Sequence, residues 1–73
     1  MRRFLLLDVG CLDCHEPTEP ISLHETRNDA MRSTPATWRV TDLDEESVWH
    51  ARYNVFVVID LEQLEVVAVG YPP

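Results

Sequence analysis

The residues with the most distinctive chemistry are two cysteines, Cys11 and Cys14, which are followed directly by His15. Thiolates at C-x-x-C spacing can bind one tetrahedral zinc ion, and such a pair after a strand forms half of a zinc knuckle. The chain has no second C-x-x-C, so the remaining ligands would be histidines. Cys11, Cys14, His24 and His50 form the least strained set, because His15 adjoins Cys14. One hypothesis is therefore a small domain stabilised by structural zinc.

Other uses of this motif fit the sequence less well. C-x-x-C-H also matches the attachment site of a c-type haem, but that chemistry requires export and a cavity that a chain of 73 residues can hardly enclose. A redox C-x-x-C needs its first thiol at a helix N-terminus, whereas prolines and acidic residues follow Cys14. Two free thiols in a loop are the simplest alternative to zinc.

The sequence does not predict an enzyme. Ser22, Ser33 and Ser47 lack a Gly-x-Ser-x-Gly context, and no glycine-rich phosphate loop is present. His24 and His50 fall in expected strands, where a hydrogen-bonded structural histidine is more common than a catalytic one. A chain of this length can hardly enclose a ligand pocket of about 300 Å³. We therefore expect a non-enzymatic protein.

Composition restricts the partners and the compartment. The chain has 13 acidic residues against six basic ones, all arginine, for a formal charge of −7. Nucleic-acid binding requires a basic stripe, so direct binding to nucleic acid is not expected. The apolar run after Arg3 is broken at Asp8, too early for a secretory signal, and no segment is long enough to span a membrane. Together with closely spaced cysteines, this predicts a cytoplasmic protein.

An acidic cluster with neighbouring aromatic residues is the candidate partner-binding surface. Aromatic anchors beside charge are typical of binding hot spots, and surplus carboxylates favour encounter with a basic surface. The alternative is a solvated turn that keeps the sheet soluble. Trp38, also nearby in the sequence, is expected in the core. The expected partner-binding residues are Asp42, Asp44, Glu45, Glu46, Trp49 and Tyr53.

Hydrophobic patterning predicts one α+β domain over residues 1–73, a small antiparallel β-sheet with one short α-helix. Thr26 should cap the helix, and Pro35 limits its length. A hairpin turn is expected at 61–63, and Tyr71 and the prolines after it should lie outside the sheet. Expected strands span 4–9, 21–24, 36–41, 49–53, 55–60 and 64–69, and the expected helix spans 27–32. For the strand at 49–53 the alternative is a helix capped by Thr41 and Asp44, which the apolar spacing fits less well.

In size, acidity and absence of lysine, the whole chain resembles small phage-encoded regulators of host RNA polymerase. The resemblance implies a protein that docks on the polymerase and inhibits initiation or alters termination. No motif carries it, so it assigns no residue a role. The order of the first strand, the cysteine loop, the second strand and the Thr26 cap is similar to small strand–loop–strand–helix domains that often hold a C-x-x-C. Nucleic-acid mimicry is the least favoured alternative, because six arginines weaken the negative field.

Overall fold

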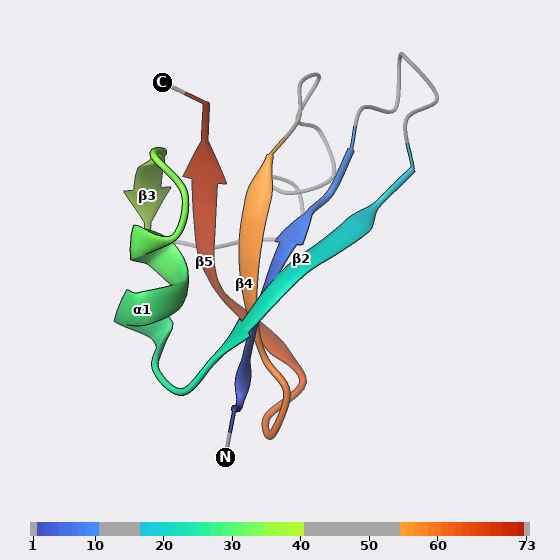
Figure 1. Ribbon diagram of the computed structural model, residues 1–73, viewed down its shortest axis with the longest axis vertical. Coiled ribbons are helices and arrows are strands. Elements are labelled where there is room, and N and C mark those ends of the chain that lie inside the picture. The colour runs from blue at the N-terminus through green and yellow to red at the C-terminus, as the bar shows by residue number, and fades with distance from the viewer. Residues whose placement is uncertain (1, 11–16, 41–54, 73) are drawn as a thin grey trace.

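The computed structural model describes residues 2–10, 17–40 and 55–72. In these residues, five strands form one antiparallel sheet in the order β2-β1-β4-β5-β3, and a short helix covers one face of it (Figure 1). This confirms the predicted α+β class. The helix is far too short to cross a membrane, and the described residues contain no other. The elements are β1 (Phe4–Asp8), β2 (Glu19–His24), α1 (Arg27–Arg32), β3 (Thr37–Arg39), β4 (Phe56–Asp60) and β5 (Glu65–Tyr71).

The boundaries of all five strands differ from the sequence prediction by one or two residues, and the differences in β2 and β5 matter most for the sheet. β2 begins at Glu19, two residues earlier than expected, although Pro20 follows. β5 continues through Gly70 to Tyr71, whose partner in β3 is Thr37. The prediction that Tyr71 lies outside the sheet was therefore wrong. Only the prolines after it lack the amide hydrogen that a ladder needs.

Helix α1 begins and ends as its sequence predicts. The Thr26 hydroxyl accepts a hydrogen bond from the backbone N–H of Asp29 at 3.1 Å, which satisfies one of the unpaired amides of the first turn. The helix ends at the C-cap Ser33, two residues before Pro35. Ala30 is the buried residue of α1 and packs on the sheet. A small side chain at this position lets the helix backbone lie close to the strands.

Apolar side chains form two clusters, one on each face of the sheet. On the face that α1 covers, here called the helix face, Leu6, Val58 and Ala68 pack with Ala30. Leu6 opposes Val58, and Val58 opposes Ala68, so these three side chains lie in one line across β1, β4 and β5. The second face carries a cluster built on Val55, Val57 and Val69, with partly buried residues around it. β1 lies between β2 and β4, which explains why its sequence is apolar on both faces.

Trp38 joins the helix-face cluster through a close contact with Gly70. The two residues are directly opposed across β3 and β5, and Trp38 packs against the core as expected from the sequence. A Cβ atom at Gly70 would lie 2.7 Å from the indole ring, so a glycine is needed at this position. The Trp38 ring lies over Gly70 and fills the space that a side chain would otherwise occupy. Such pairs of an aromatic residue and a glycine on neighbouring strands stabilise the edges of sheets.

Candidate functional site

Most of the residues that the sequence nominated lie outside the described residues. Of the zinc ligands this applies to Cys11, Cys14 and His50, and the zinc hypothesis stays a prediction. The expected strand at 49–53 also lies outside the described residues. So does the whole expected partner-binding surface, namely Asp42, Asp44, Glu45, Glu46, Trp49 and Tyr53.

His24 is the one nominated residue that the structure places, at the end of β2. Its Nε2 lies 2.7 Å from the Ser22 hydroxyl oxygen and 3.0 Å from that of Ser33. The Ser33 hydroxyl also donates to the carbonyl of Asp29, and the two serine hydroxyls together occupy the Nε2 side of the imidazole. A zinc ion would therefore have to bind at Nδ1. Over the described ranges, no three histidine, cysteine or acidic side chains converge on a metal-sized site. His24 here connects the end of α1 to β2.

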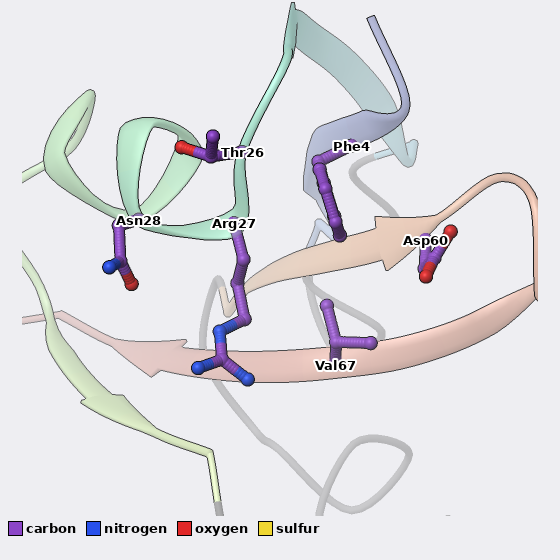
Figure 2. Close-up of a pocket in the computed structure, with 6 residues that line it drawn as sticks. All are labelled: Phe4, Thr26, Arg27, Asn28, Asp60 and Val67. Carbon is purple, nitrogen blue, oxygen red and sulfur yellow. The ribbon is translucent and has the colours of Figure 1, made fainter.

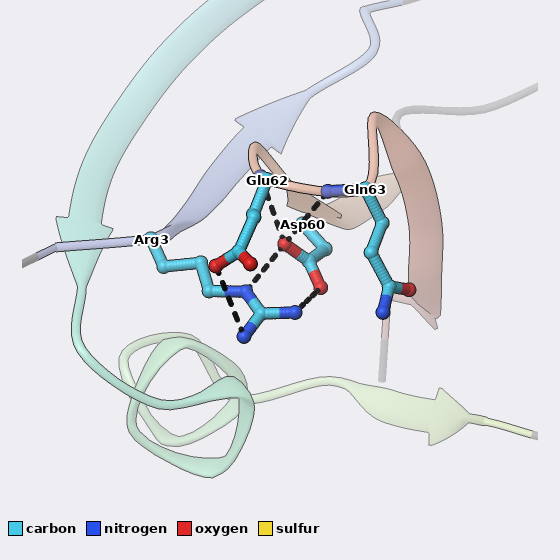
Figure 3. Close-up of polar contacts among 4 residues, drawn as sticks. All are labelled: Arg3, Asp60, Glu62 and Gln63. Carbon is cyan, nitrogen blue, oxygen red and sulfur yellow. Dashed lines mark hydrogen bonds and ion pairs between the residues drawn. The ribbon is translucent and has the colours of Figure 1, made fainter.

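A polar cluster fixes the hairpin between β4 and β5 (Figure 3). The Arg3 guanidinium donates to both carboxylate oxygens of Asp60, at 2.6 and 2.5 Å, and lies 3.4 Å from a carboxylate oxygen of Glu62. Backbone N–H groups of Glu62 and Gln63 also donate to Asp60, which is 3% exposed. The Arg3 hydrogen bonds, aided by those amides, lower the pKa of Asp60 to about 2. The turn is thus held in one geometry.

A shallow pocket of about 300 Å³ lies between the start of α1 and the sheet (Figure 2). Phe4 and Val67 supply apolar wall, and Arg27 extends across the opening toward β5. Two of its polar groups are already engaged, because Thr26 caps α1 and Asp60 binds Arg3. The pocket is too open to exclude water from a bound molecule, so it is the weaker candidate site.

The stronger candidate is an exposed apolar surface on the second face of the sheet. Leu23 opposes Leu5, Leu5 opposes Ile59, and Ile59 opposes Val66, so their side chains share one face across four strands. Leu23 is 43% exposed and Val66 is 36% exposed, while the two residues between them are half-buried. These residues belong to the face opposite α1, since Leu7, two positions after Leu5, packs in the second cluster.

Leu61 extends this surface toward the hairpin. Its N–H donates to the carbonyl of Arg3 at 2.9 Å, so the pairing of β1 with β4 continues by one residue. Leu61 follows Ile59 by two positions and is 41% exposed. We call Leu5, Leu23, Ile59, Leu61 and Val66 the apolar patch. Single exposed apolar residues are ordinary, whereas a contiguous apolar surface is a feature of interaction sites, which makes the apolar patch the stronger candidate.

The hairpin tip beside the patch has an unusual backbone. Leu64 has φ of 56°, the left-handed region that glycine and asparagine favour, and is 79% exposed. The turn residues are Leu61, Glu62, Gln63 and Leu64, one more than the sequence predicted. The sequence has no glycine or asparagine in this turn, so a leucine takes the left-handed conformation instead. The tip presents a leucine to solvent in a strained conformation.

Sequence reasoning missed the apolar patch because its members come from separate strands. The alternation of Ile21-Ser22-Leu23-His24 is typical of a half-buried strand, and in such strands the apolar side ordinarily faces inward. The structure reverses this, since Ser22 and His24 are partly buried whereas Ile21 and Leu23 are exposed. Only the register of β2 against β1 reveals which side is covered.

Comparison of the chain with family models, curated proteins and solved structures gave no match.

Proposed function

We propose that this protein is a non-enzymatic regulator that binds a larger protein through the apolar patch, with bacterial RNA polymerase as the candidate partner. The observation that supports this most is the alignment of Leu23, Leu5, Ile59 and Val66 across four strands. Burying apolar surface contributes about 25 cal/mol per Å². A patch that presents several partly exposed aliphatic side chains on a rigid sheet can therefore supply the centre of a protein interface.

The charge of the chain indicates which residues should form the rim of the binding surface on the partner. With a formal charge of −7, the protein is attracted to a basic surface, which raises the rate of association and is screened by salt. Near the patch, Glu25, Glu62 and Glu65 are exposed carboxylates, and Arg3 is already bound to Asp60. The partner surface that fits is apolar at its centre and rich in Arg or Lys at its rim.

We name bacterial RNA polymerase as the partner because the whole chain resembles phage-encoded regulators of that enzyme. A small acidic domain that occupies a docking surface for an initiation factor would inhibit initiation, and one that stays bound during elongation would alter termination. Both effects require only protein–protein contacts, as the proposed function does.

Binding of the purified chain to purified bacterial RNA polymerase tests the proposal. The chain is immobilised, and core enzyme and holoenzyme are passed over it at low and high salt. We expect saturable binding that weakens as salt rises, because the charges at the rim are exposed. Leu61→Glu should weaken binding about tenfold or more. The matched control is Val40→Glu, since Val40 is 40% exposed against 41% for Leu61 but lies outside the patch.

Two results would count against the proposal. If neither polymerase form binds at micromolar concentrations, the named partner is wrong. If Val40→Glu weakens binding as much as Leu61→Glu, the patch is not the contact surface. Transcription from a purified promoter, with and without a terminator downstream, then separates an effect on initiation from an effect on termination.

A further inference from the structure

We propose that the outer edge of β2, along residues 21–24 and the adjoining Glu25, binds an extended segment of the partner as a sixth strand, and that this segment carries apolar side chains flanked by Arg or Lys. The inference rests on the proposed function, since it takes the ligand to be a protein. It adds how the partner is bound and what sequence chemistry it presents.

The first observation is that β2 is a terminal strand with an accessible edge. It pairs with β1 on one side, and within the described ranges no strand pairs with its other side. Residues 17–21 are all exposed. A terminal strand of this length offers a row of backbone N–H and C=O groups to an incoming strand. Addition of a strand to such an edge needs no rearrangement of the sheet.

The second observation is that the edge is protected over its first half only. Pro20 cannot donate a backbone hydrogen bond, and the register of β2 against β1 shifts at Ile21, which lies between the partners of Leu6 and Leu7. Both features discourage pairing near the start of β2. The stretch from Ile21 to Glu25 contains no proline, glycine or lysine. Backbone pairing is therefore expected after the bulge, from Ser22 to the end of β2 and the adjoining Glu25, with Ile21 contributing its side chain.

The opposite edge of the sheet lacks these properties. β3 has three residues, and its central residue, Trp38, is packed against the helix-face cluster. Arg39, at its end, is basic and would repel a basic segment. A basic segment would therefore bind at the β2 edge rather than at the β3 edge.

The side chains beside the β2 edge suit an apolar strand. Ile21 is 48% exposed and Leu23 is 43% exposed. This is unusual, because the apolar side of a half-buried strand normally faces the core. Here Ser22 and His24 take the inward side, where His24 contacts the end of α1. A sixth strand would cover both aliphatic side chains and extend the apolar patch, to which Leu23 already belongs.

The charges at the ends of this edge define the rest of the ligand. Glu19 and Glu25 are both exposed and bracket the two aliphatic residues. No Arg or Lys occurs between Pro17 and Thr26, so these two glutamates are the carboxylates that a ligand on this edge would meet. Opposite charges across paired strands are favourable, and like charges are not. The complementary segment has two apolar residues at alternate positions and a basic residue toward each end.

The test uses a synthetic peptide with the full-length protein. The probe is a capped seven-residue peptide with arginine at both ends and alternating threonine and valine between them, added at millimolar concentrations to ¹⁵N-labelled protein. We expect the largest amide shifts at residues 21–25 and small ones in β3. The control peptide replaces both arginines with glutamate and should cause little shift, because its charges repel Glu19 and Glu25.

Two variants of matched exposure complete the test. Ile21→Lys should weaken binding of the arginine peptide about tenfold, whereas Val40→Lys should change it less than twofold, and circular dichroism establishes that both are folded. The inference is overturned if residues 21–25 do not shift, if both peptides bind alike, or if the two variants behave alike.

The same variants separate this inference from the proposed function. If polymerase binding is lost in Leu61→Glu but unchanged in Ile21→Lys, the partner does not use the edge and the strand-addition model fails while the proposed function stands. If polymerase does not bind but the arginine peptide adds to β2, the edge site stands and the named partner is wrong.

Discussion

Substitution of Gly70 by alanine tests how tightly the edge of the sheet is packed. The added Cβ would lie 2.7, 2.8 and 2.9 Å from three atoms of the Trp38 ring, closer than side-chain atoms normally approach. The ring cannot move away freely, because it packs against the helix-face cluster. Gly70 does not have a positive φ, so alanine itself fits the backbone there. The expected loss of stability therefore comes from the contact with Trp38.

Two opposing contributions set the magnitude. Overpacking a well-filled site costs about 1–3 kcal/mol. Replacing glycine by alanine at a compatible position gains about 0.4–1 kcal/mol, because the unfolded chain becomes less flexible. We expect a net loss of about 0.5–2 kcal/mol in the free energy of unfolding for Gly70→Ala.

Urea unfolding followed by far-ultraviolet circular dichroism measures this change, and a double-mutant cycle with Trp38→Thr identifies its cause. Threonine keeps the preference for a strand and removes the ring. In that background Gly70→Ala should stabilise the protein by about 0.4–1 kcal/mol, so the sign of the effect reverses. An equal loss in both backgrounds would show that the contact with Trp38 is not the reason for glycine at this position.

Three further predictions concern the polar cluster, the helix cap and the hairpin tip. Because the pKa of Asp60 is lowered to about 2 by Arg3, its stabilising contribution is present above the ordinary pKa of about 3.9 and is lost as the pH falls through 2. Acid titration of stability should therefore show a decline below pH about 4 that is smaller in Asp60→Asn. Thr26→Ala should cost about 1 kcal/mol in urea unfolding, because it removes the N-cap of α1, and an unchanged midpoint would show that the cap contributes nothing. Leu64→Gly should raise the free energy of unfolding by up to about 1 kcal/mol, since the relief of about 1–2 kcal/mol at a φ of 56° exceeds the entropic cost of glycine; a lower melting temperature would contradict this.

Local patterns in the sequence were sufficient for several parts of the fold. The β-branched runs on either side of the turn at Leu61 predicted β4 and β5, because such residues favour a pleated, half-buried surface. Thr26 and Pro35 delimited α1, since a cap and a helix breaker act over a few residues only. Helix and strand identity over these segments depends on near neighbours, which the sequence contains.

The candidate site could not be found in this way. The sequence drew attention to the cysteines and the acidic cluster, where residue types and short spacing suggest chemistry. The apolar patch has no such signature, because Leu5, Leu23 and Ile59 are adjacent only through strand pairing. A shift of one residue in that register would move every side chain of β2 to the other face.

Composition and alternation by themselves thus determined a small acidic α+β domain and the approximate extents of its strands and helix. Which side of β2 is covered was decided by the tertiary structure, which places His24 against the end of α1 and leaves Ile21 and Leu23 exposed. The physical reason is that alternation divides a strand into two sides, whereas only packing against another element selects the one that is buried.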